Sequence, residues 1–222
     1  MKSGAMMMKR LVCSLGAAAL LSGALTACVP LVVGGAVAGG SLLAIDRRTS
    51  GAQLEDEGIE LRAASRIRGT FGDRVHVNLT SYNRQVLLTG EVPSAQDKQQ
   101  VEQVVAGVEN VVSVVNELAA VMGQTSFSQR SNDTFVTGRV KAMLLDARDL
   151  QSNAFKVVTE RGTVYLMGRV TQREADRATQ VVRSTPGVQK VIRVFDVISE
   201  QELARLAPPP KPPPAPLKPA DY

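Results

Sequence analysis

The sequence has no tryptophan, one histidine and two cysteines. Both thiols, Cys13 and Cys28, fall in the first 28 residues, so the rest of the chain can form neither a disulfide nor a cysteine-based metal site. His76 has no second histidine and no cysteine with which to form a nucleophile–base pair or a metal site. The glycine-rich run at 34–40 lacks the Lys-Ser/Thr pair of a phosphate-binding loop. We therefore expect no enzyme, no metal and no cofactor.

The N-terminal segment has the pattern of a secretory signal peptide. Two basic residues, Lys9 and Arg10, precede an apolar stretch that ends in Leu25-Thr26-Ala27-Cys28. A leucine, small residues and then cysteine resemble the lipobox of bacterial lipoproteins. That resemblance implies that Cys28 is acylated, with palmitate among its acyl chains, and becomes the mature N-terminus. The alternatives are an ordinary signal peptide or one long membrane helix over 11–45, which its glycines and Pro30 disfavour.

The charge of the mature protein is close to neutral. The whole chain has 26 basic and 21 acidic residues. Three of the basic residues lie in 1–27, so removal of the signal peptide leaves 23 against 21. A secreted chain with this balance is not expected to bind nucleic acid.

The chain repeats itself. Residues 85–92 align with 163–170 at a shift of 78, and a Gly-Val pair at 107–108 recurs at 187–188. Two copies predict two homologous domains rather than a solenoid. Each copy has roughly 65 to 70 residues, near the lower limit for independent stability, so we expect the two domains to pack on one another.

Each copy is predicted to fold as helix, strand, strand, helix, strand. In the first copy Asp56 is predicted as the N-cap of a helix, and the following apolar stripe is formed by Ile59, Ala63 and Ile67. Strands are predicted at 75–80, 85–91 and 111–118, with a helix from Ser94 to Gly107.

The second copy repeats this scheme. Asp133 is predicted to cap a helix to Ala147 whose inner face is Val136, Val140 and Leu144. Strands are predicted at 155–159, 163–170 and 188–198, and Thr171 with Glu174 has the pattern of a capping box.

The fold class is therefore α+β, with two tandem αββαβ domains, each a three-stranded mixed sheet with two helices on one face. The expected segments are a signal peptide at 1–27, a lipidated cysteine and tether at 28–53, domains at 54–121 and 131–200 with a linker at 122–130, and a Pro-rich tail at 201–222. The tail is predicted to be solvated or to form an extended polyproline rod.

A strand ending in Gly-x-Val, followed by Gly-Val before the last strand, resembles the BON domain. Two such domains behind a lipobox, together with the stretches 46–53 and 131–134, resemble the dual-BON outer-membrane lipoproteins of Gram-negative bacteria (the DolP/YraP type). The resemblance implies a lipid anchor in the inner leaflet of the outer membrane, binding of anionic phospholipid such as phosphatidylglycerol, and a role in envelope integrity. This chain departs from that type at Phe135, where relatives carry tryptophan, and in its Pro-rich tail.

Phe135 is the main candidate for a lipid contact. Helical periodicity places it away from the predicted core face, on the side of Arg139 and Ala142. An exposed aromatic ring beside cations suits the membrane interface, and Lys141 and Leu145 join the same candidate surface. The alternative is that Phe135 packs against the other domain.

The expected function is that of a lipid-binding adaptor at the periplasmic face of the outer membrane. The alternative is a protein-interaction module that docks on envelope assembly proteins through a sheet edge such as 188–198 or through the Pro-rich tail.

Overall fold

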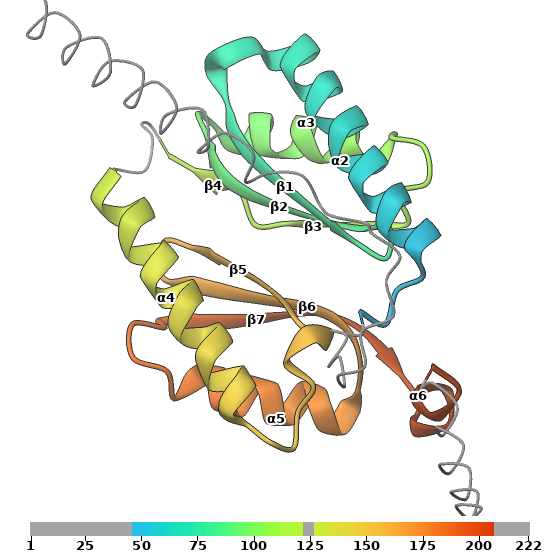
Figure 1. The fold of residues 1–222 in the computed structure, drawn as a ribbon. Coiled ribbons are helices and arrows are strands. Elements are labelled where there is room, and N and C mark those ends of the chain that lie inside the picture. Colours follow the sequence, from blue (N-terminus) through green and yellow to red (C-terminus); the bar gives the residue numbers. More distant parts are fainter. Residues whose placement is uncertain (1–45, 122–126, 207–222) are drawn as a thin grey trace, which may run out of the picture. The chain divides into compact units, whose positions relative to one another are not determined.

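The computed structural model describes residues 46–121 and 127–206 of the 222-residue chain. These residues form two αββαβ repeats, each with two helices on one face of a small mixed sheet (Figure 1). The predicted fold class is confirmed.

The first repeat contains α2 (Ser50–Phe71), a 3₁₀ turn η1 (Gly72–Arg74), β1 (His76–Tyr82), β2 (Gln85–Val92), α3 (Ala95–Ala106), β3 (Ser113–Asn116) and β4 (Ala119–Ala120). Strand β2 is central: it pairs antiparallel with β1 and parallel with β3 and β4. The third strand, predicted at 111–118, is thus shorter than expected and is followed by a separate two-residue bridge.

The second repeat contains α4 (Phe127–Asp146), a 3₁₀ turn η2 (Ser152–Ala154), β5 (Lys156–Glu160), β6 (Thr163–Thr171), α5 (Gln172–Arg183), β7 (Lys190–Ile198) and α6 (Glu200–Leu206). Strand β6 pairs antiparallel with β5 and parallel with β7 over nine residues. The predicted capping box is confirmed, with the Thr171 side chain accepting from the Glu174 amide. Helix α6 lies where the sequence predicted only tail.

Each repeat has its own hydrophobic core between its helices and its sheet. The predicted apolar stripes are confirmed: Ile59 and Ala63 are fully buried in the first core, and Val140 is fully buried in the second. A third cluster joins the repeats on the faces of the sheets that the helices leave open, and it consists of Tyr82, Leu87, Tyr165, Met167 and Val194. The expected packing of one repeat on the other is therefore observed.

The prediction that Asp56 and Asp133 are helix N-caps is wrong. Helix α2 begins earlier, at Ser50, with Thr49 as its N-cap, and α4 begins at Phe127. Both aspartates lie inside their helices and are buried.

Each of these carboxylates instead accepts hydrogen bonds from the two residues that turn the chain into the central strand. Asp56 accepts from the amides of Asn83 and Arg84 at 2.8 and 2.7 Å. Asp133 accepts from the amides of Arg161 and Gly162 at 2.8 and 2.9 Å. All four turn residues have positive φ, as in a two-residue type I′ hairpin turn, so the aspartates hold the hairpins onto the first helices.

Candidate functional site

The predicted lipid-binding residues lie on the outer side of α4. Phe135 is 71% exposed and Leu145 is 73% exposed, and both point away from the buried Val140 on the inner side. Phe135 and Ala142 are seven residues apart, which places them about 20° apart around the helix axis. All five predicted side chains, Phe135, Arg139, Lys141, Ala142 and Leu145, are exposed.

Because Phe135 is exposed, the alternative that it packs against the first repeat does not apply. Between Phe135 and Leu145 the outer side of α4 has only small residues, Gly138 and Ala142. A Cβ placed on Gly138 would have no neighbour within 4 Å. The two large apolar side chains therefore stand above their surroundings on this helix.

Two cations flank this apolar surface. The Arg139 guanidinium donates to the carbonyl of Pro186 at 3.3 Å, which holds it against the loop that follows α5 while it stays exposed. Lys141 is exposed on the opposite flank. Asp146, the last residue of α4, is also exposed and places a negative charge at that end of the helix. The two positive charges therefore lie nearer the middle of α4 along its length.

The corresponding helix of the first repeat, α2, is different. Gly58 occupies the position equivalent to Phe135. Exposed Leu61 lines a shallow hollow of about 500 Å³ with the acidic side chains of Glu57 and Glu60. Two of its basic side chains are engaged locally: Arg62 donates to Glu55 at 2.6 Å, and Arg66 donates to the carbonyl of Gly107 at 2.6 Å. Nothing on α2 repeats the aromatic and cationic surface of α4.

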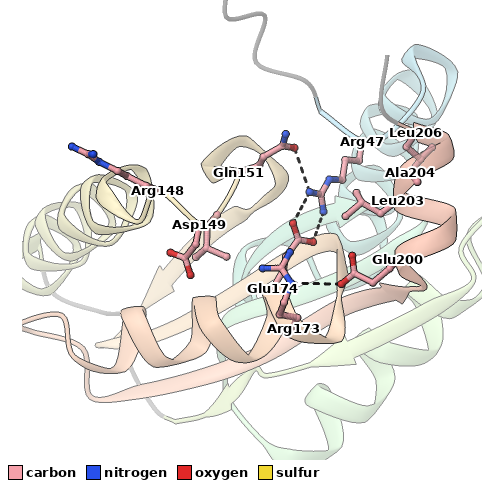
Figure 2. Close-up of a pocket in the computed structure, with 11 residues that line it drawn as sticks. Arg47, Arg148, Asp149, Gln151, Arg173, Glu174, Glu200, Leu203, Ala204 and Leu206 are labelled. Atoms are coloured by element: carbon pink, nitrogen blue, oxygen red, sulfur yellow. Dashed lines mark hydrogen bonds and ion pairs between the residues drawn. The ribbon is translucent and has the colours of Figure 1, made fainter. Parts of the chain in front are cut away.

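A second feature was not predicted from the sequence. A hollow of about 430 Å³ lies at the start of α5, with α6 and the loop after α4 as its other walls (Figure 2). The Arg47 side chain lies against this hollow and forms a bidentate ion pair with Glu174, in which both N–O distances are 2.7 Å. Burial opposes ionisation of Glu174, but the hydrogen bonds from Arg47 and from the Thr171 amide outweigh it and lower the Glu174 pKa.

The predicted lipidation residue, Cys28, lies outside the described residues, as do the predicted signal peptide and the Pro-rich tail from 207. Among the residues that the structure describes, no helix is both long and apolar enough to cross a membrane.

Comparison with known families identifies the two repeats. The BON-domain family model matches residues 56–122 and 132–199. The chain belongs to the BON-domain family. It is 38% identical to "Outer membrane lipoprotein DolP" of Haemophilus influenzae over 85% of this chain and 95% of that protein. A BON protein with this coverage is a homologue of the DolP-type outer membrane lipoproteins.

Two further relatives share less of the chain. "21 kDa hemolysin" of Actinobacillus pleuropneumoniae is 31% identical over 69% of this chain and 80% of its own length. "Osmotically-inducible protein Y" of Escherichia coli is 32% identical over 52% of this chain and 58% of its own length.

Proposed function

We propose that this protein is a lipid-anchored, non-enzymatic adaptor at the periplasmic face of the outer membrane. In this proposal Cys28 carries the anchor, and the second BON domain binds anionic phospholipid through the outer side of α4, in support of envelope integrity. The observation that supports it best is the exposure of Phe135 and Leu145 beside Arg139 and Lys141 on one helix. The near full-length similarity to an outer membrane lipoprotein supports the location.

The chemistry of the α4 surface suits a shallow contact with headgroups and the first acyl carbons. Burial of one large apolar side chain is worth about 1.5 to 3 kcal/mol, which Phe135 and Leu145 would each gain on entering the interface. Each cation near an anionic surface adds about 1 kcal/mol, so Arg139 and Lys141 would make binding depend on lipid charge. The apolar side chains would gain equally in either kind of membrane, so the two cations would supply the preference for an anionic membrane over a zwitterionic one.

The test is binding of residues 46–222, without the anchor, to vesicles of phosphatidylglycerol and of phosphatidylcholine. We expect binding to phosphatidylglycerol alone, weakening with added salt. Phe135→Asp and Leu145→Asp should each abolish it, because a charge at the interface reverses the apolar gain. Leu61→Asp is the matched control: this leucine is also 73% exposed, on the equivalent helix of the first repeat, and its substitution should leave binding unchanged.

Unchanged vesicle binding by Phe135→Asp would contradict the proposal. Cys28 would then be the only expected membrane contact, and a protein-interaction module would be the better description. Equal loss in all three variants would also contradict it, because a specific surface on α4 predicts a difference between the repeats.

A further inference from the structure

Two consecutive arginines, Arg47 and Arg48, lie at the start of the described chain, and each contacts a different repeat. Arg47 enters the second repeat, where its guanidinium donates both to the Glu174 carboxylate and to the carbonyl of Arg169 at 3.0 Å. It also donates to the Gln151 side chain at 3.3 Å. The Arg47 and Glu174 side chains are only 4% and 5% exposed, so this pair is removed from solvent.

Arg48 is held by the first repeat. It donates to Asp56 in α2 at 2.7 Å, and its guanidinium lies 4.2 Å from the centre of the Tyr82 ring at the end of β1. The Tyr82 hydroxyl in turn accepts from the Arg169 amide at 3.3 Å, so the two arginines and Tyr82 form one closed set of contacts across the repeats. Asp46 adds a second carboxylate to Arg48 at 2.7 Å.

The C-terminal helix covers the same place. Glu202 of α6 pairs with the Arg169 side chain, and Glu200 pairs with Arg173 at 3.6 Å. Figure 2 shows Arg47 pointing between Gln151 and Glu174, with Leu203 of α6 on the same side. The segment that leads from the predicted anchor and the helix that leads into the Pro-rich tail therefore meet at one site.

Other ion pairs between the repeats have at least one partly exposed partner: Arg161, which lies 3.8 Å from the buried Glu91, is 41% exposed. Lys156 and Glu60 lie 3.4 Å apart with side chains 39% and 33% exposed. The apolar cluster between the sheets consists of only five buried side chains. A buried, two-pronged ion pair at the rim of this small cluster is thus the most specific connection that the structure shows between the tether segment and the second repeat.

We propose that residues 46–48 act as a latch that holds the two BON domains together at the point where the anchoring segment enters the fold. Arg47 fastens the segment to the second repeat and Arg48 fastens it to the first. The residues that follow the predicted anchoring segment would then be tied to both domains at once. The latch does not depend on whether α4 binds lipid.

The test is hydroxyl-radical footprinting of the full-length protein in detergent, with oxidation read by mass spectrometry. Three oxidisable side chains, Tyr82, Tyr165 and Met167, are buried between the repeats and report their separation. Phe71 and Phe155 are buried in the separate cores and report unfolding of either repeat. Because both kinds of reporter lie in one chain, opening is distinguished from loss of fold.

In Arg47→Met we expect oxidation of the inter-repeat reporters to rise about tenfold, equivalent to about 1.4 kcal/mol in the opening equilibrium, with the core reporters unchanged. Glu174→Gln, which keeps the capping-box geometry, should behave in the same way. Arg173→Met is the matched control, since Arg173 lines the same hollow but is 60% exposed, and it should match the unsubstituted protein.

The double variant Arg47→Met, Glu174→Gln separates a latch from a simple charge effect. This double variant leaves no unpaired buried charge, but it still lacks the ion pair between residues 47 and 174. The proposal therefore predicts that oxidation of the inter-repeat reporters remains as high as in the single variants. If the inter-repeat reporters of the double variant were as protected from oxidation as in the unsubstituted protein, the proposal would be overturned. The same conclusion would follow if Arg47→Met alone left these reporters protected. If oxidation of Phe71 and Phe155 rose together with that of the inter-repeat reporters, the proposal would also be overturned, because Arg47 would then stabilise the whole fold rather than the contact between the repeats.

Discussion

Two glycines in the central strands make a sharp prediction about stability. A Cβ on Gly90 in β2 would lie 2.2 Å from the carbonyl oxygen of His76, and a Cβ on Gly168 in β6 would lie 2.3 Å from that of Ala154. The same 78-residue shift separates both the glycines and their carbonyl partners, so the close approach is a feature of the repeat. Real Cβ contacts under 3.0 Å essentially never occur.

The cost of an alanine follows from this geometry. Relief of either contact needs a backbone movement of about 1 Å in a packed sheet, and overpacking of this kind costs about 1 to 3 kcal/mol. Gly90 also has φ +112°, a conformation that costs a side-chain-bearing residue about 1 to 3 kcal/mol more. We therefore expect Gly90→Ala to destabilise the protein by about 2 to 6 kcal/mol and Gly168→Ala by less.

At two other glycines, the same change to alanine is expected to raise the stability of the protein instead of lowering it. At Gly69 in α2 and Gly138 in α4, an added Cβ would have no neighbouring atom within 4 Å. Alanine in a helix is favoured over glycine by about 1 kcal/mol, so Gly69→Ala and Gly138→Ala should stabilise the protein. From most to least stable, the expected order is Gly138→Ala, the unsubstituted protein, Gly168→Ala and Gly90→Ala.

Thermal unfolding of residues 46–222, followed by circular dichroism, measures this order. For a chain of this size each 1 kcal/mol corresponds to about 2 to 4 °C in Tm. Gly90→Ala should therefore lower Tm by at least about 4 °C. A Gly90→Ala protein that melts with the unsubstituted one would refute the steric reasoning, and so would a fall in Tm for Gly138→Ala.

Two carboxylates should show opposite effects on stability. Burial and the charge of Glu91 raise the pKa of Glu160, so its ionised form opposes folding above that pKa. Glu160→Gln keeps an acceptor for Asn78 and should raise Tm at pH 7, with a smaller gain at about pH 4, where Glu160 is protonated in the folded state. Burial opposes ionisation of Asp56, but hydrogen bonds led by that of the Arg84 amide lower its pKa. Its stabilisation is therefore present above the unfolded pKa of about 3.9 and is lost as the pH falls through the lower folded value, so Asp56→Asn should flatten the acid side of a urea-midpoint profile against pH.

Helical periodicity predicted the orientation of α4 correctly. The side chains that face the core recur every fourth residue, and Val136, Val140 and Leu144 are all 1% exposed or less. Once that inner face was assigned, the outward direction of Phe135 followed from its place in the 3.6-residue repeat. Such an inference needs only contacts within one helix and its own sheet.

Contacts between distant segments could not be predicted in this way. Asp56 and Asp133 precede apolar stripes, as N-caps do, but their acceptor role depends on hairpin turns 27 to 29 residues away. Arg47 and Glu174 are 127 residues apart in the sequence. In the sequence, Glu174 is already explained by the capping box, so nothing local indicated that it also binds an arginine from the tether.

The packing of the repeats limits where each domain can bind a partner. The helix-free faces of the two sheets contribute Leu87 from the first repeat and Met167 from the second to their shared cluster, so these faces are not available to ligands. What remains to each repeat is the outer side of its helices and its sheet edges. There the two copies differ, because α4 has Phe135 at the position that corresponds to Gly58, and the surface around Leu61 of α2 carries the acidic residues Glu57 and Glu60. Duplication of one fold has thus left a shared interface that is structural and outer helix surfaces that are free to diverge in what they bind.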